Sequence, residues 1–250
     1  MEASNFPFRY WLMAIHLVTF TKKSFSALEM QRQLGHKRYE PIWAMLHKLR
    51  IVMGNRDDRY KLEGLVELDE AFFEHIPLEK KEPEDPEKRR RGSNKQGKVL
   101  VMASTEPIKK KDRPDKHSKP SRLKFIKMRV VDDLSSYTIA SQVKSDVHPK
   151  STVRTDGYLG HQRLKEVVAR HKALVLPPKE QGKVLPWVHT AISNAKRLFL
   201  GTHHSIRQDY LQNYLDEFCY KLKRNYFKER LFDRLMIASV TAPWYESQTL

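Results

Sequence analysis

The sequence contains very little cysteine and no long apolar run, and each shortage excludes a class of protein. Its 250 residues include a single cysteine, Cys219, so neither an internal disulfide nor a multi-cysteine zinc site can form. The most apolar early stretch, Tyr10 to Phe20, is far shorter than the ~20 residues that span a bilayer, and it lacks the small-residue cleavage site of a signal peptide. We therefore expect a cytoplasmic protein without a membrane partner.

Negative charge is scarce relative to positive charge. Lys and Arg total 47 against 30 Asp and Glu, which gives a formal net charge of +17. Such an excess says nothing about the fold but indicates a polyanionic partner, with nucleic acid ahead of an anionic membrane surface. Hydrophobic residues make up 40% of the chain, which is a globular rather than a disordered composition.

Residues 1–60 have the pattern of a small all-α segment. An apolar helix is expected over Phe8 to Phe20. Ser26-Ala-Leu-Glu29 is a capping box that begins a short second helix ending at Gly35, and a third helix follows with a basic face opposite its apolar face. Helix, short helix, glycine-containing turn and basic helix form a helix-turn-helix pattern, although a helical bundle with a solvated basic face has the same spacing. The DNA contacts expected from this segment are Lys37, Arg38, Lys48 and Arg50.

Two charged, proline-broken segments, near 77–97 and 105–121, lack any periodicity, and we expect them to be mobile loops. Their basic side chains are either solvated hairpin tips or contacts to DNA phosphates, which fix position without reading sequence. The phosphate contacts expected from the first loop are Arg89, Arg90 and Arg91.

The rest of the chain shows three strand-like runs, then strands alternating with helices. The first three runs are separated by hairpin-type loops, and the later alternation indicates parallel pairing. This is the order of an RNase H-like mixed sheet, so we expect an α/β catalytic domain over 61–240 with helices flanking the sheet, preceded by the helical segment. The expected strands are 64–73, 98–103, 123–131, 151–156 and 173–176, and the expected helices are 135–143, 162–171, 188–200, 207–224 and 229–239.

Two aspartates in this pattern indicate chemistry. Asp69 lies within a largely apolar strand, where a carboxylate is costly unless it is paired or binds a cation. Asp156 ends the fourth strand, and strand C-termini in such sheets are where ligands bind. Strands one and four are adjacent in the expected topology, so the two carboxylates would meet at one point.

Two carboxylates that close repel each other, and a divalent cation removes the repulsion. Hard oxygen ligands select Mg²⁺ or Mn²⁺, and two such ions about 3.5–4 Å apart activate the attacking oxygen and stabilise the leaving oxygen in phosphodiester chemistry. The structural alternatives are a buried salt bridge for Asp69 and an Asp-Gly turn for Asp156. We expect neither Glu67 nor Glu70 to be a ligand, because strand alternation is taken to point both away from Asp69.

Three segments resemble the sequence blocks of bacterial DDE-type insertion-sequence transposases: Leu65-Val-Glu-Leu-Asp-Glu-Ala-Phe72, Arg154-Thr-Asp-Gly-Tyr158, and the run from Val188 to His204. The closest subgroup carries a zinc ribbon and helix-turn-helix ahead of an RNase H-like core, and the resemblance covers about residues 8–225. It implies Asp69 and Asp156 as ligands of a two-metal Mg²⁺ or Mn²⁺ site. It also implies cleavage and strand transfer at inverted-repeat ends of double-stranded DNA, by a nucleoid-associated homo-oligomer in a synaptic complex. The zinc ribbon itself has no counterpart here, because one cysteine cannot supply it.

The resemblance leaves the third metal ligand open. Many relatives place Glu seven residues before a Lys, which here is His189 before Lys196, and others carry Asn, which here is Asn194. Asn194 is slightly favoured by ligand hardness, whereas helical register favours His189. Lys196 and Arg197 are expected near DNA phosphates.

The leading hypothesis is therefore a metal-dependent DNA transposase. The first alternative is a catalytically degenerate remnant that still binds DNA, and the second is a nuclease of the same fold in which water replaces the DNA 3′-OH as nucleophile. A basic RNA-binding protein is disfavoured because it leaves Asp69 and Asp156 unexplained.

Overall fold

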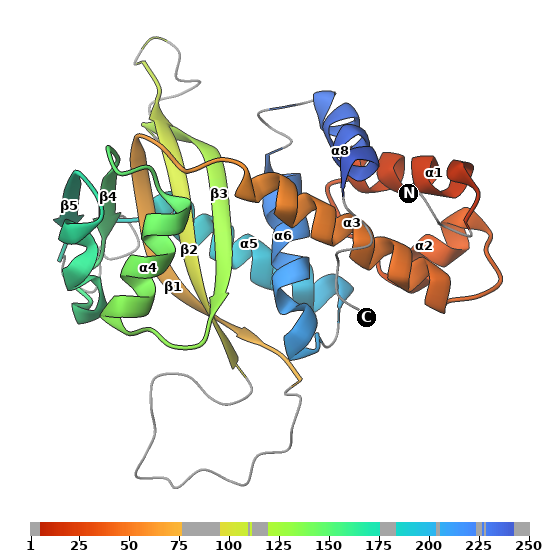
Figure 1. The fold of residues 1–250 in the computed structure, drawn as a ribbon, viewed down its shortest axis with the longest axis horizontal. Helices are drawn as coiled ribbons and strands as arrows, with labels where there is room; N and C mark the ends of the chain where they lie inside the picture. The colour runs from red at the N-terminus through yellow and green to blue at the C-terminus, as the bar shows by residue number, and fades with distance from the viewer. Residues whose placement is uncertain are drawn as a thin grey trace, which may run out of the picture. The chain divides into compact units, whose positions relative to one another are not determined.

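The structure is a computed structural model that describes residues 6–76, 96–109, 111, 120–175, 184–203, 206–223, 227 and 229–242 (Figure 1). Arg89, Arg90, Arg91 and most of the two expected loops lie outside these residues. The chain forms two compact units, one from Met1–Arg59, Leu198–His204 and Asn213–Leu250, the other from Tyr60–Arg197 and Ser205–Gln212. The expected single domain over 61–240 is thus divided, because its last helices pack with the N-terminal ones. No helix in the described part of the chain is long and apolar enough to cross a membrane.

The first unit is helical. Ser26 accepts the backbone N–H of Glu29 at 3.1 Å, as the capping box predicts, whereas the Glu29 carboxylate bonds Gln33 instead of reaching back. Gly35 ends the second helix at φ 63°, a left-handed conformation that glycine adopts without strain. The helices that share the core of this unit are α1 (Phe8–Phe20), α2 (Ala27–Leu34), α3 (Glu40–Asp58), α6 (Leu211–Leu222) and α8 (Arg230–Thr241).

Arg50 of α3 is buried rather than presented to DNA. Its side chain is 2% exposed, and its Nε donates to Glu217 Oε2 at 2.8 Å. Its guanidinium also lies 4.1 Å from the centre of the Tyr214 ring. The prediction that Arg50 contacts DNA is therefore wrong, because a side chain from α6 covers the basic face of α3 at this point.

The second unit is built on a five-stranded mixed sheet in the order β3-β2-β1-β4-β5. Strand β1 pairs antiparallel with β2 and parallel with β4, β2 pairs antiparallel with β3, and β4 pairs parallel with β5. The expected RNase H-like α/β class and the adjacency of strands one and four are confirmed. The strands are β1 (Leu65–Glu74), β2 (Gln96–Pro107), β3 (Ser121–Val131), β4 (Thr152–Thr155) and β5 (Arg170–Ala173).

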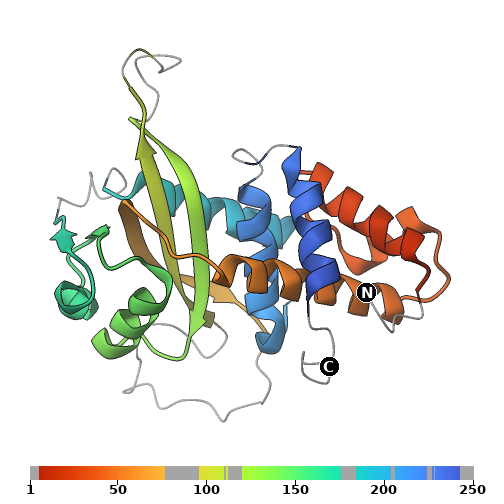
Figure 2. The ribbon, with the colours of Figure 1, turned by 45° about the horizontal axis from the view of Figure 1, so that its top comes forward.

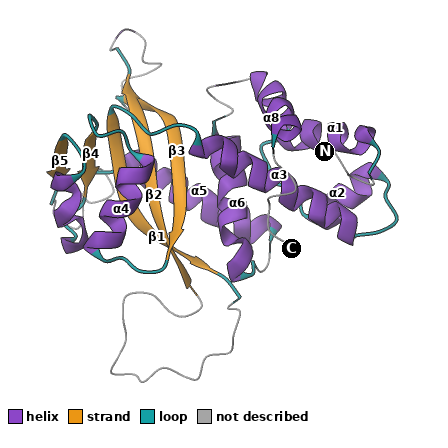
Figure 3. Ribbon diagram, viewed as in Figure 1, coloured by secondary structure: helices purple, strands orange, loops and turns teal. Residues whose placement is uncertain are grey.

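Helices cover both faces of this sheet (Figures 2 and 3). Helix α4 (Ser136–Asp146) and the 3₁₀ helix η3 (Leu159–Glu166) share an apolar core with Val66 and Leu68 of β1. Helix α5 (Pro186–Thr202) lies on the other face of β1, and a short 3₁₀ turn, η5 (Gln208–Tyr210), precedes α6. The expected helix over 162–171 is instead the earlier and tighter η3, so the fifth strand begins at 170 rather than 173.

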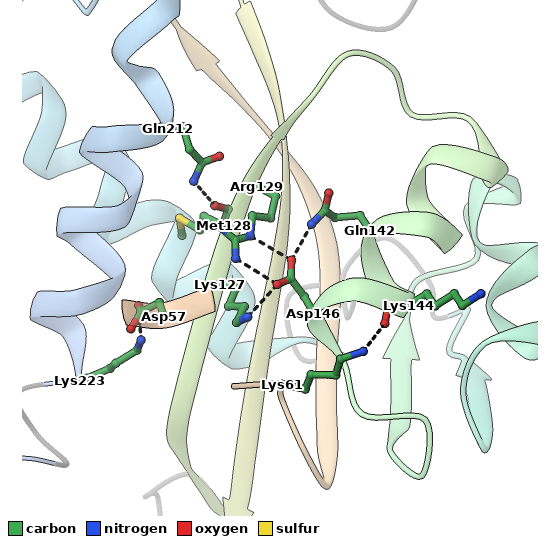
Figure 4. Close-up of polar contacts among 10 residues, drawn as sticks. All are labelled: Asp57, Lys61, Lys127, Met128, Arg129, Gln142, Lys144, Asp146, Gln212 and Lys223. Carbon is green, nitrogen blue, oxygen red and sulfur yellow. Dashed lines mark hydrogen bonds and ion pairs between the residues drawn. The ribbon is translucent and has the colours of Figure 1, made fainter. Parts of the chain in front are cut away.

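A buried ionic cluster fastens α4 to β3 (Figure 4). Asp146, at the end of α4, accepts from Lys127 at 2.7 Å, from Arg129 at 2.9 Å and from Gln142 at 2.6 Å. Burial alone would raise the pKa of Asp146, but hydrogen bonding and the charges of Arg129 and Lys127 outweigh it, and the pKa is lowered. Lys127 and Arg129 of β3 therefore neutralise the Asp146 carboxylate instead of facing solvent.

The outer edge of β3 is closed by a single side chain. Gln212 donates to the carbonyl of Met128 at 2.9 Å and accepts from the amide of Val130 at 2.8 Å, so its amide group takes the place of a neighbouring strand (Figure 4). Unpaired backbone groups on an edge strand invite pairing with other chains, and this contact satisfies two of them.

Candidate active site

The pairing of β1 with β4 brings Asp69 and Asp156 together. Their register runs from Leu65 opposite Thr152 to Glu67 opposite Arg154. Continued by two residues, just past the end of β4 at Thr155, this register would put Asp69 beside Asp156. The negative charge of Asp156 acts on Asp69, where it raises the pKa of that carboxyl. The two candidate ligands, far apart in sequence, are therefore neighbours at the end of β4.

Asp69 lies in a partly buried and negatively charged environment. Its side chain is 16% exposed, and its Oδ1 accepts the N–H of Glu70 at 2.9 Å. Burial and the Glu70 charge raise the pKa of Asp69 to about 6, although the Glu70 N–H and His189 act in the opposite direction. Among the described residues, His189 is the one basic residue that forms an ion pair with Asp69, so the alternative of a buried salt bridge to Lys or Arg is not found there.

Asp156 combines a turn with an accessible carboxylate. Its Oδ1 accepts the N–H of Tyr158 at 3.0 Å, which is the local hydrogen bond expected of an Asp-Gly turn. A Cβ at Gly157 would lie 2.5 Å from the exposed side chain of Val175, which would have to shift. Because 46% of the Asp156 side chain is exposed, the turn leaves its carboxylate open to a ligand.

Helix α5 is attached to β1 by Glu67. The carboxylate Oε2 of Glu67 accepts the backbone N–H of Trp187 at 2.8 Å and of Val188 at 3.1 Å. The expectation that Glu67 points away from Asp69 is wrong, because residues two apart on a strand share a face. One residue along the helix, His189 Nδ1 lies 3.7 Å from Asp69 Oδ2. Glu67 thus anchors the helix that carries a third site residue.

His189 and Asn194 point in different directions on α5. They are five residues apart, which corresponds to a rotation of about 140° around a helix. His189 lies beside Asp69, whereas Asn194 Oδ1 accepts from Arg197 at 3.2 Å. Lys196 is exposed on the same face as His189, with its Nζ 5.9 Å from the centre of the Phe73 ring. This geometry favours His189, the residue that ligand hardness ranked second.

Sequence reasoning missed His161. It lies on η3, and its Nε2 is 2.6 Å from Glu70 Oε1, on the face of β1 opposite Asp69. Its Nδ1 is 3.3 Å from Asp156 Oδ1. Glu70 does point away from Asp69, as expected, yet it reaches the site through this histidine. The sequence offers no motif for the contact, which depends on the pairing of β1 with β4.

The candidate DNA contacts differ in accessibility. Lys37, Arg38, Lys196 and Arg197 are exposed, Lys48 is half-buried, and Arg50 is buried. The turn before α3 therefore retains two exposed basic groups, Lys37 and Arg38, while Lys196 and Arg197 are exposed on α5, the helix that carries His189.

The donor set suits a hard divalent cation. Asp69 and Asp156 offer carboxylate oxygens, and His189 adds a nitrogen that Mn²⁺ accepts more readily than Mg²⁺. Across the described ranges, no three His, Cys, Asp or Glu side chains already stand in ligand geometry. The fit therefore consists of two adjacent oxygen donors whose mutual repulsion a cation would remove.

Comparisons with known proteins agree with these motifs. Solved structures with some likeness include the Mos1 strand transfer complex, at 11% identity and a TM-score of 0.34 over 96% of this chain and 80% of that chain. Another is the Mos1 transposase paired-end complex with left transposon end, at 10% identity and a TM-score of 0.32, over 96% of this chain and 82% of that chain. No curated protein matches the sequence. Residues 61–223, however, match the ISXO2-like transposase domain, and they include both aspartates, His161 and His189. The chain belongs to the family of ISXO2-like transposases.

Proposed function

We propose that this protein cleaves DNA at the ends of an insertion sequence and joins the freed 3′ end to a target, with Mg²⁺ or Mn²⁺. The observation that carries the proposal is the register of β1 and β4, which sets Asp69 beside Asp156 within a transposase-family domain. Bound between them, the cation would supply charge neutralisation and an activated oxygen for in-line displacement at phosphorus.

The chain's own residues then have separate tasks. Asp69 and Asp156 hold the cation, with His189 as the proposed third ligand in place of Asn194. Lys196, exposed on the same helix face, binds a non-bridging phosphate oxygen and orients the DNA strand. Lys37 and Arg38 contribute phosphate contacts from a helix-turn-helix arrangement of α2 and α3. Two copies of the chain would hold the two transposon ends in a synaptic homo-oligomer.

One alternative has a specific observation in its favour. The third position offers His or Asn instead of a carboxylate, which weakens binding of hard cations. A remnant that binds DNA without cutting it would have this composition and would retain the exposed basic residues.

Nicking of supercoiled plasmid tests the proposal. Wild-type protein is incubated with Mn²⁺, Mg²⁺ or EDTA beside Asp156→Asn. Asparagine retains an oxygen that accepts the Tyr158 N–H, so the turn survives while the ligand charge is lost. We expect metal-dependent nicking that disappears in the variant. A folded wild type that binds DNA but leaves the plasmid intact would support the remnant, and equal nicking by the variant would refute the metal site.

A further inference from the structure

A buried histidine links the two strands that carry the aspartates. His161 and Glu70 have side chains that are 1% and 2% exposed, and they meet at 2.6 Å through His161 Nε2 and Glu70 Oε1. The ring of Tyr158 packs edge-on against the imidazole, with centres 5.5 Å apart. Because its position is fixed on these sides, the ring presents its Nδ1 edge to Asp156, where Nδ1 and Oδ1 are 3.3 Å apart.

This pair is poorly explained by stability alone. A buried carboxylate and imidazole are costly, and an apolar pair of similar volume stabilises a core at least as well. Glu70 Oε2 and His161 Nδ1 are both buried without a hydrogen bond from any described residue. Among the described residues, the nearest charged neighbour recorded for His161 Nδ1 is therefore the Asp156 carboxylate, at 3.3 Å.

The two side-chain contacts of Asp156 involve the same carboxylate oxygen. The Tyr158 N–H and the His161 ring both approach Oδ1. Within the described part of the chain, no hydrogen bond or ion pair is made to Oδ2, which leaves that oxygen for a cation. Polar partners behind a metal ligand fix its orientation, here a hydrogen bond from Tyr158 and the charged contact with His161, and the loss of such partners typically costs 10–100-fold in metal affinity.

We propose that His161, held by Glu70, is a positioning residue that orients Asp156 toward the divalent cation. The inference rests on the proposed metal-dependent function. It adds a chain of positioning contacts that runs from Glu70 on β1 through His161 to Asp156 at the end of β4. Neither Glu70 nor His161 contacts the cation in this arrangement. Their effect passes through the carboxylate.

Two substitutions separate positioning from packing, because each retains one of the two ring nitrogens. In His161→Gln the amide nitrogen falls near the position of Nε2 and keeps a donor for Glu70, whereas the Asp156 contact is lost. In His161→Asn the amide nitrogen falls near Nδ1 and keeps the Asp156 contact, whereas Glu70 is left unpaired. Affinity for Mn²⁺ is measured from the loss of its free-ion paramagnetic resonance signal, and thermal unfolding is recorded on the same samples.

We expect each variant to change a different one of the two measured quantities. His161→Gln should bind Mn²⁺ about 10–100-fold more weakly than wild type at a nearly unchanged unfolding temperature. His161→Asn should unfold at a lower temperature but bind Mn²⁺ within a few-fold of wild type. A residue that only supported packing would lower both quantities together in each variant, and that outcome would overturn the proposal.

The controls distinguish this proposal from the function on which it rests. Binding that is lost in Asp156→Asn but intact in His161→Gln would overturn the positioning role and leave the metal site standing. Absence of Mn²⁺ binding by folded wild type would overturn both. Nitrogen coupling to bound Mn²⁺ that vanishes in His161→Gln but persists in His189→Gln would make His161 a direct ligand, which would also overturn positioning.

Discussion

The carboxylate of Glu67 accepts the backbone N–H of Trp187 at 2.8 Å, across 120 positions of sequence. The contact places a negative charge at the N-terminus of α5, where free amides and the helix dipole favour an anion. It also decides where His189 lies, since that residue follows two positions later. A side chain outside the metal site thus sets the distance between β1 and the helix that completes it.

Removal of this anchor should lower the stability of the protein. We expect Glu67→Leu to lower the free energy of unfolding by about 1–3 kcal/mol, because two buried amides lose their acceptor. Glu67→Gln keeps an acceptor oxygen without the charge and should lose roughly half as much. Urea unfolding measures both variants. Wild-type stability in Glu67→Leu would show that α5 is held by other contacts.

The third site position can be decided by paired alanine substitutions. His189→Ala should reduce Mn²⁺-dependent plasmid nicking by about 10-fold or more, because the imidazole lies beside Asp69. Asn194→Ala, which removes a side chain bonded to Arg197, should stay within a few-fold of wild type. Initial nicking rates at saturating DNA provide the measurement. The reverse order would return Asn194 to the role that ligand hardness first suggested.

Arg50 and Lys37 should separate stability from DNA affinity. Arg50→Met removes the nearer of the two cations beside the buried Glu217 and leaves only Lys221, at 3.8 Å; it should cost about 3–5 kcal/mol, most of which a second change, Glu217→Leu, should restore. Lys37→Ala should leave unfolding unchanged. It should flatten the plot of log affinity for duplex DNA against log salt by about one unit. A stable Arg50→Met with a flattened salt slope would refute the buried assignment.

The helical unit should lose stability in mild acid. Burial lowers the pKa of His47 to about 3, with the Arg50 charge adding to the effect, and burial lowers the pKa of His203 to about 4. Both rings stay neutral in the folded chain at pH values where the unfolded chain, near 6.5, takes up protons. The two histidines therefore contribute fully to the free energy of unfolding above pH 6.5. As the pH falls below that value, the free energy of unfolding decreases by up to about 1.4 kcal/mol per pH unit for each histidine.

Glu217 extends the same trend to lower pH. Burial opposes its ionisation, but Arg50 and Lys221 outweigh burial and lower the pKa of Glu217 to about 2, so its contribution is lost below about pH 4.5. Urea titrations at pH 7.5, 6 and 5 measure the histidine range. His203→Gln should remove about half of the slope there. An equal pH dependence in wild type and His203→Gln would mean that His203 titrates normally.

The sequence was sufficient for features that depend on strand order. Apolar runs and hairpin loops predict the mixed sheet, and the sheet order alone brings Asp69 to Asp156. It was insufficient where one segment covers another. Helical spacing gives Arg50 a solvent-facing position, and only the packing of α6 shows that Glu217 buries it. His161 meets Glu70 through tertiary contacts that no local pattern of residues encodes.

The helical unit is assembled from both ends of the chain, since Met30 and Met53 share a core with Tyr220, Leu231 and Leu235. A ribosome that has translated the first 60 residues has therefore made helices without their partners. The sheet unit is equally incomplete, because His189 follows Asp69 by 120 residues. A product that ends before α5 consequently has neither a finished helical core nor the full set of proposed metal ligands. Translation must reach the last helix before the N-terminal helices can complete their core.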